Sequence, residues 1–193
     1  MNKEELRKKY KIVRHNLKNK KDQSLSICNS ISNHPMYRSA NVVALYAHLE
    51  DEVDVDSLIL LSLKEGKRVC LPKIKDNNHM EFVEITSMVE LDTVSKFNIK
   101  EPSNNNVVSI EVIDLMICPG IAFDLNNNRI GFGKGYYDEY LSRKNNIYKI
   151  GVTFIECHID EMVNTTSFDI PMNEVIDKKV LFYYFLYDNI IFV

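Results

Sequence analysis

The residues whose types and spacing most clearly suggest chemistry lie between positions 129 and 138. Three of the chain's six glycines, Gly131, Gly133 and Gly135, occupy alternate positions there. Glycine adopts left-handed and extended backbone conformations without strain, so this spacing lets a ligand approach the main chain closely. Arg129 and Lys134 add two positive charges to the same segment. The combination predicts a site for phosphate.

The flanking residues indicate how this segment is held. Residues 112–118 form an apolar run broken by one acid, which predicts a buried strand, and residues 136–144 have helical spacing. A glycine-rich turn between strand and helix points N–H groups and the positive end of the helix dipole at an anion. Asp138 falls in the first helical turn, where a carboxylate can hold a divalent cation against the same phosphates. The simplest ligand is a magnesium nucleotide.

The motif is neither the dinucleotide pattern G-x-G-x-x-G nor the P-loop pattern, because Lys134 is followed by Gly135. A bare G-x-G-x-G is equally compatible with a surface turn, since glycine occurs in turns of every kind. The flanking charges favour phosphate.

Composition limits the class of protein. With 193 residues, of which 45% are hydrophobic, the chain can bury one core, and we expect one domain over residues 1–193. A net charge of −3 argues against general nucleic-acid binding. The apolar C-terminal stretch, residues 180–193, is too short for a membrane span and predicts one strand or two short ones. With no targeting segment and widely separated cysteines, we expect a cytoplasmic protein with reduced thiols at Cys28, Cys70, Cys118 and Cys157.

Two helices are predicted near the N-terminus. Over residues 3–18 the apolar side chains follow an amphipathic period, and on composition alone the basic residues Lys3, Arg7, Lys11 and Arg14 are a solvated face. Residues 24–33 predict a second helix whose buried side is formed by Leu25, Cys28 and Ile31.

The next segments predict an α/β domain. Residues 42–46 are apolar, as in an interior parallel strand, and the acidic residues 49–56 follow where open α/β sheets place binding loops. Asp54 or Asp56 is also expected to cap a helix over residues 57–65, which Gly66 ends. Residues 68–72 then complete a right-handed β-α-β unit. Further strands are predicted over residues 80–85 and 148–154, and Asp169, in a late loop, is a second candidate metal ligand.

Residues 119–124 and 129–138, read together, resemble the motif of the 5-formyltetrahydrofolate cyclo-ligases. The resemblance extends over nearly the whole chain, and the other matching residues are Lys3, Arg7, Asp51, Glu52, residues 71–73, His79, Met80 and residues 168–171. It implies a single-domain, doubly wound open sheet, mostly parallel, with helices on both faces. It also implies ATP- and Mg²⁺-dependent closure of 5-formyltetrahydrofolate to 5,10-methenyltetrahydrofolate, with ADP and phosphate released.

The resemblance implies a role for each site residue. The metal ligands are Asp138 and Asp169, and the catalytic cations are Arg129 and Lys134. Folate contacts are Glu52, Tyr136 and Phe97, the last standing where related chains often have tryptophan. The ATP contacts are Lys3, Arg7, Arg129, Gly131, Gly133, Lys134, Gly135 and Tyr137. We expect a monomer that acts on these small molecules and on neither nucleic acid nor membrane.

Two other functions remain open at this point. A nucleotide-binding module without turnover would keep the glycine turn, and a small-molecule kinase would use the same phosphate site. The presence of Asp138, Asp169 and Glu52 favours the cyclo-ligase over the first.

Overall fold

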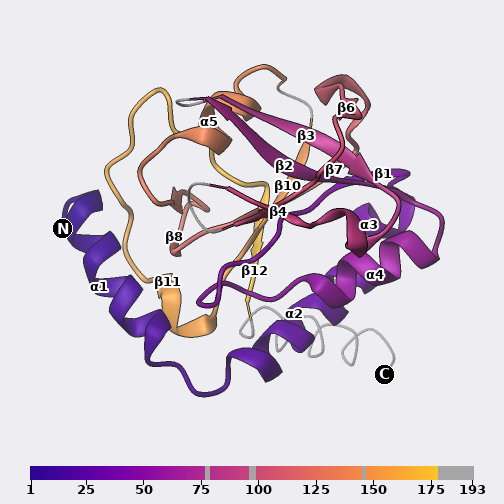
Figure 1. Ribbon diagram of the computed structural model, residues 1–193. Coiled ribbons are helices and arrows are strands. Elements are labelled where there is room, and N and C mark those ends of the chain that lie inside the picture. Colours follow the sequence, from indigo (N-terminus) through magenta and orange to yellow (C-terminus); the bar gives the residue numbers. More distant parts are fainter. Residues whose placement is uncertain (77–78, 96–98, 145–146, 178–193) are drawn as a thin grey trace, which may run out of the picture.

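The computed structural model describes residues 1–76, 79–95, 99–144 and 147–177. Within these ranges the centre of the fold is a seven-stranded sheet with the order β12-β10-β7-β1-β2-β3-β6 (Figure 1). Its strands, in chain order, are β1 (Val42–Ala44), β2 (Arg68–Asp76), β3 (His79–Ile85), β6 (Val107–Val108), β7 (Leu115–Pro119), β10 (Tyr148–Val152) and β12 (Glu174–Ile176).

The sheet is mostly parallel, as predicted. Strands β12, β10, β7, β1 and β2 pair in parallel, whereas β3 and β6 add an antiparallel edge. Interior strands of this kind are buried on both faces, which explains the unbroken apolar runs in β1 and β7. Strand β2 is longer than predicted because it continues into a hairpin with β3, in which Lys73 lies opposite Glu81.

Two small sheets accompany the main one. The strands β8 (Ala122–Asp124) and β9 (Arg129–Ile130) form a hairpin directly after β7, and β11 (His158–Ile159) pairs with β8. This hairpin positions Arg129. The strands β4 (Thr93–Val94) and β5 (Lys100–Glu101) form the other small sheet. Short 3₁₀ turns lie at Met88–Glu90, Ile110–Val112 and Ile155–Cys157.

Helices cover both faces of the main sheet, unequally. The helices α2 (Lys20–Asn33), α3 (Pro35–Ser39) and α4 (Asp56–Lys64) lie on one side, α5 (Tyr136–Leu141) lies on the other, and α1 (Lys3–His15) runs beside the β8–β9 hairpin (Figure 1). Successive side chains of β7 point to opposite faces of the sheet. Ile117 packs in the core under α1–α4, and Met116 packs in the core under α5.

Some predicted details were wrong. In α2 Cys28 and Ile31 are buried as predicted, but the side chain of Leu25 is 48% exposed and Ile27 is buried in its place. Steps of three residues rotate about 60° short of a full helical turn, so Leu25 and Ile31 cannot share one face. The predicted cap of α4 is also different: Asp54 accepts a hydrogen bond from the Asp56 N–H at 2.9 Å, but the helix begins at Asp56 with no side-chain cap.

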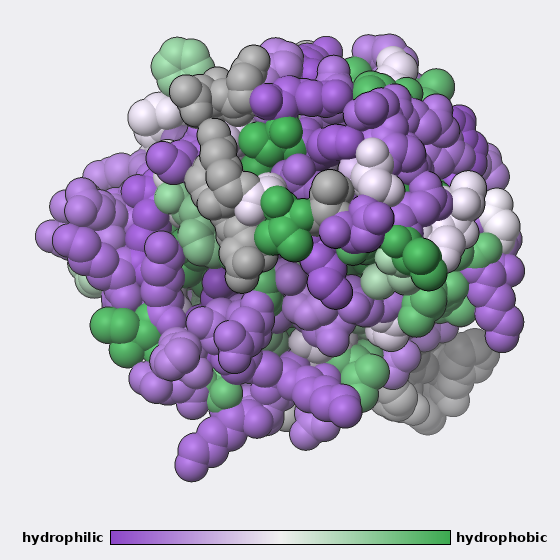
Figure 2. Space-filling view, viewed as in Figure 1, coloured by the Kyte–Doolittle hydropathy of each residue, from purple (hydrophilic) through white to green (hydrophobic). Residues whose placement is uncertain are grey.

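The helix end at Gly66 and the free thiols were as predicted. Gly66 follows α4 with φ +75°, a conformation that suits glycine. All four cysteines are buried and free. No helix in the described ranges is long and apolar enough to cross a membrane, and the face in Figure 2 is mostly hydrophilic with hydrophobic patches near its centre. The predicted C-terminal strand, residues 180–193, lies outside the described residues.

Candidate active site

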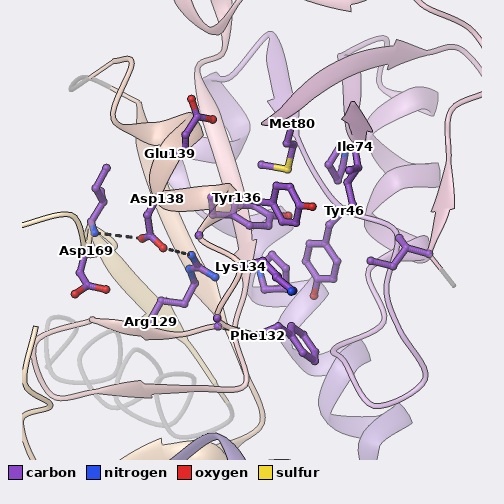
Figure 3. Close-up of a pocket in the computed structure, with 18 of the residues that line it drawn as sticks. Tyr46, Ile74, Met80, Arg129, Phe132, Lys134, Tyr136, Asp138, Glu139 and Asp169 are labelled. Atoms are coloured by element: carbon purple, nitrogen blue, oxygen red, sulfur yellow. Dashed lines mark hydrogen bonds and ion pairs between the residues drawn. The ribbon is translucent and has the colours of Figure 1, made fainter. Parts of the chain in front are cut away.

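A cleft of about 830 Å³ opens at the carboxyl ends of β1, β2 and β7 (Figure 3). Binding sites of open α/β sheets form at this edge, where successive strands end beside one another. One wall is the segment from Arg129 to Glu139, which runs from β9 into α5. The opposite wall comes from the residues after β1, together with Pro72, Ile74 and Met80 of the β2–β3 hairpin.

The glycine turn, residues 131–135, joins β9 to α5 along the cleft. Gly133 and Gly135 have φ values of +89° and +71°, which side-chain-bearing residues adopt only with strain. Gly135 is the residue before α5 and provides no side-chain cap. Because α5 ends at Leu141 and not at 144 as predicted, its dipole is smaller than that of a longer helix. Most of the positive charge at the turn therefore comes from side chains.

The first helix contributes two of these side chains. Arg7 Nε donates a hydrogen bond to the Gly131 carbonyl oxygen at 2.9 Å, and the Lys3 ammonium group forms an ion pair with Asp169. Both side chains are half-buried and line the cleft. The composition-based expectation of a solvated face is therefore wrong for Lys3 and Arg7.

Arg129 and Asp138 form an ion pair on the same wall, with 2.9 Å between Nη2 and Oδ2 (Figure 3). The Arg129 guanidinium lies 5.0 Å from the centre of the Tyr137 ring. Its Nε is buried without a hydrogen-bond partner among the described residues. Arg129 is thus held by a carboxylate and an aromatic face, and it retains an unused donor.

Asp169 lies near Asp138 and Arg129, on the same side of the cleft (Figure 3). Its Oδ2 accepts hydrogen bonds from the Thr166 N–H and hydroxyl, at 2.7 and 3.0 Å. Burial acts to raise the pKa of Asp169, but the hydrogen bonds from Lys3 and Thr166 outweigh it, and the pKa lies below its ordinary value. Asp169 is therefore ionised at neutral pH.

Glu52 occupies the opposite wall. It is 7% exposed, and its Oε2 accepts a hydrogen bond from the Leu49 N–H at 3.0 Å. Burial raises the pKa of the Glu52 carboxyl, and the Leu49 N–H and the charge of Arg14 offset only part of this effect. Around it the wall is largely apolar, with Tyr46, Ile74 and Met80 facing the cleft (Figure 3). The two walls therefore differ: one is charged and contains the glycine turn, and the other is apolar with one buried carboxyl.

The model of the 5-formyltetrahydrofolate cyclo-ligase family matches residues 1–178. This chain belongs to that family. It is 34% identical over 148 residues to a probable 5-formyltetrahydrofolate cyclo-ligase of Schizosaccharomyces pombe, a match that covers 69% of this chain and 72% of the relative. It is 34% identical over 128 residues to the 5-formyltetrahydrofolate cyclo-ligase of Mus musculus, and that match spans 63% of each chain, a little under two thirds of the relative's length.

Solved structures agree with the cyclo-ligase family. The NMR structure of Aquifex aeolicus 5,10-methenyltetrahydrofolate synthetase superposes with a TM-score of 0.81 and 34% sequence identity, covering 93% of this chain and 91% of that one. A 5,10-methenyltetrahydrofolate synthetase from Mycoplasma pneumoniae has a TM-score of 0.74 at 24% identity and supports the fold. The predicted α/β architecture is confirmed.

The cleft brings together most of the residues that the cyclo-ligase resemblance implied. Those that line it are Lys3, Arg7, Glu52, Arg129, Gly131, Gly133, Lys134, Gly135, Tyr136, Tyr137, Asp138 and Asp169. Phe97 lies outside the described residues. The ligand that each residue contacts stays a prediction.

The acidic segment of this cyclo-ligase family member divides between two roles. Glu52 faces the cleft, whereas Asp54 and Asp56 lie near His48 Nδ1, at 3.6 and 3.3 Å, beside the start of α4. The nearby carboxylate of Asp56 raises the pKa of His48, so charges of opposite sign balance one another there. Asp51 pairs with Lys20 and His15 on the outer side.

Sequence reasoning missed two residues beside the glycine turn. Phe132 is 44% exposed and lines the cleft, and Arg14 is 3% exposed behind it, although it was expected on a solvated face. The spacing of the sequence could have placed Arg14 near the site. Arg7 and Arg14 are two helical turns apart and therefore share one face of α1.

Proposed function

We propose that this protein is a 5-formyltetrahydrofolate cyclo-ligase, which converts its substrate to 5,10-methenyltetrahydrofolate with ATP and Mg²⁺. The observation that carries the proposal is that the charged glycine turn and the buried Glu52 form facing walls of one cleft. A nucleotide's phosphates suit the first wall and a pterin ring suits the second. Family membership supports the same reaction.

The glycine turn and four cations form the proposed nucleotide side. Lys134 is exposed at the turn and is free to reach a phosphate, while Arg7 is fixed against the Gly131 carbonyl. Phosphoryl transfer depends mainly on positioning and charge neutralisation. Positive charge comes from three segments, α1 (Lys3 and Arg7), β9 (Arg129) and the glycine turn (Lys134), so these side chains can surround a triphosphate.

The donor set also fits Mg²⁺. Asp138 and Asp169 are oxygen donors at the same wall, and each already has a cation as its partner, Arg129 and Lys3 respectively. Hard oxygen ligands of this kind, completed by phosphate oxygens, are what Mg²⁺ prefers. The metal, when bound, supplies charge stabilisation to the phosphates. Asp138 and Asp169 would hold the metal, and Lys3 and Arg129, their ion-pair partners, would lie beside the phosphates of the nucleotide.

The proposed folate side is built around Glu52. Its carboxyl lies in an apolar environment, where a hydrogen bond to a substrate nitrogen is strong because water does not compete. Ile74 and Met80 provide apolar contact for a flat ring. Tyr136 lies where the two walls meet (Figure 3) and is suited to contact both substrates.

The proposed reaction has two steps. The formyl oxygen attacks the γ-phosphorus, the bond to the ADP oxygen breaks, and an imidate-like phosphate forms. N10 of the same molecule then attacks the activated carbon, the carbon–oxygen bond breaks to release phosphate, and N10 loses its proton. Arg129 and Lys134 stabilise the charge on the transferring phosphoryl group. The cleft also holds the two reacting groups together, which lowers the entropic part of the barrier.

The decisive experiment incubates the purified protein with Mg-ATP and 5-formyltetrahydrofolate and follows the absorbance of the methenyl product. Formation of methenyltetrahydrofolate together with equal amounts of ADP and phosphate supports the proposal. ATP binding without product would indicate a nucleotide-binding module. Phosphate transfer to an added acceptor without cyclisation would indicate a kinase. A reaction mixture with a non-hydrolysable ATP analogue is the matched control.

A further inference from the structure

Phe132 is an exposed aromatic residue in the middle of the glycine turn, between Gly131 and Gly133. Its ring is accompanied by two cations from α1: Lys11 Nζ lies 4.9 Å and Arg14 Cζ lies 5.6 Å from the ring centre. Both distances are within the range at which a cation is attracted to an aromatic face. The exposed ring is therefore a contact point between the turn and the helix.

The neighbouring residues of the turn contact the same helix. Arg7 Nε donates to the Gly131 carbonyl oxygen at 2.9 Å, and a Cβ on Gly133 would lie 3.2 Å from Arg7 Cζ. Arg7, Lys11 and Arg14 follow one another at helical spacings of four and three, so they share one face of α1. Three consecutive residues of the turn, 131–133, thus lie against three basic side chains.

Arg14 fixes this arrangement to the core. It is 3% exposed, its Nη1 donates to the Gly120 carbonyl oxygen at 3.4 Å, and its Nε has no partner among the described residues. Gly120 directly follows β7, a central strand of the main sheet. The hydrogen bond to Gly120 and the contact with the Phe132 ring together connect the turn to the end of this strand.

We propose that Lys11, Arg14 and Phe132 form a clamp that orders the glycine turn before the nucleotide binds. Such a clamp is needed because three glycines give the turn more backbone freedom than side-chain-bearing residues would. Ordering the turn only when the ligand binds would weaken binding. Lys11 and Phe132 are positioning residues in this arrangement. Any effect of these two residues on catalysis depends on the proposed function. Their effect on the order of the turn does not depend on it.

The first test measures amide hydrogen exchange of residues 131–135 in the ligand-free protein. Lys11→Met keeps the apolar stem and removes the charge, and Phe132→Leu removes the ring. Exchange in the turn should become about two- to fivefold faster in Lys11→Met, with a larger increase in Phe132→Leu. Lys11→Arg should restore the wild-type rate. Lys8→Met is the matched control, since Lys8 pairs with Glu4 on the exposed side of α1. Unchanged exchange in both variants would overturn the clamp.

The second test is a double-mutant cycle on the affinity for Mg-ATP, measured by calorimetry. If Lys11 acts through the ring, Lys11→Met should weaken binding about two- to fivefold in the wild type and have no further effect in Phe132→Leu. An equal loss in both backgrounds would mean that Lys11 contacts the nucleotide directly, and the proposal would be wrong. Wild-type protein that orders its turn but forms no methenyl product would contradict the proposed function and leave the clamp standing.

Discussion

Lys3 and Asp169 form an ion pair between the first turn of α1 and a loop 166 positions further along the chain. The pair is partly exposed, and both of its members line the cleft. The Mg²⁺ ion that we propose at Asp169 must compete with the Lys3 ammonium group for the same carboxylate. Lys3 itself is proposed to contact ATP.

Replacement of Lys3 by alanine should therefore change two affinities in opposite directions. Binding of Mn²⁺ alone, as a spectroscopic probe for Mg²⁺, should tighten about two- to fivefold because a competing charge is removed. Binding of ATP should weaken, and the loss should shrink at higher ionic strength. Lys8→Ala removes the same charge from the solvent side of α1 and should change neither affinity. Weaker Mn²⁺ binding in Lys3→Ala would rule out the competition.

Asp138 has two proposed tasks, since it holds Arg129 in place and provides an oxygen ligand for the metal. Asp138→Asn should lower turnover about a hundredfold or more, because charge stabilisation by a metal contributes several kcal/mol. The concentration of Mn²⁺ required for half-maximal activity should rise. Asp138→Glu keeps the charge and should recover part of the activity. Near-normal turnover in Asp138→Asn would exclude both tasks.

Glu52→Gln tests the folate wall. Loss of the charged acceptor should raise the KM for 5-formyltetrahydrofolate about ten- to a hundredfold, with ATP affinity in the absence of folate unchanged. The wild-type acid limb of kcat/KM should lie above the ordinary glutamate range, because burial raises the pKa of Glu52, and the variant should lack that limb. An unaltered KM for the folate would contradict the assignment.

The same substitution has a stability consequence of defined sign. Since the folded-state pKa of Glu52 lies above its unfolded value, the stability contribution is fully present below the unfolded pKa and is lost as pH rises through the folded pKa. The free energy of unfolding of Glu52→Gln should therefore decline less than that of the wild type over this window. Denaturant titrations at several pH values measure the difference. A steeper decline in the variant would show that the sign is wrong.

Substitution of Gly133, in the glycine turn, can be compared with substitution of Gly66, which follows α4 and lies outside the cleft. Both have positive φ, +89° and +75°, so alanine at either should cost about 1–2 kcal/mol of stability. A Cβ at Gly133 would also press on Arg7 Cζ at 3.2 Å, whereas nothing lies within 4 Å of one at Gly66. Gly133→Ala should therefore raise the KM for ATP, and Gly66→Ala should leave it unchanged. Thermal unfolding and initial rates separate the two effects, and equal kinetics in the two variants would exclude a role for the turn.

Much of the fold could be predicted because its determinants are local. The apolar run at residues 42–46 predicts an interior strand, the period of residues 3–18 predicts an amphipathic helix, and Gly66 marks a helix end. Residues 129–138 likewise contain their own indication, since glycines and charges close together in the sequence also lie close together in the fold. The antiparallel continuation of β2 into β3 was less visible, because pairing of strands depends on partners and not on composition.

The sequence by itself determined the kind of site, and only the tertiary structure decided which charges belong to it. Spacing shows that Lys3, Arg7 and Arg14 share a face of α1, but not what covers that face. The β8–β9 hairpin and the glycine turn pack against it, so Arg14 is buried, Arg7 meets Gly131, and Lys3 meets Asp169. These contacts join residues far apart in sequence, and they form only when the sheet brings the elements together, because no local preference encodes them.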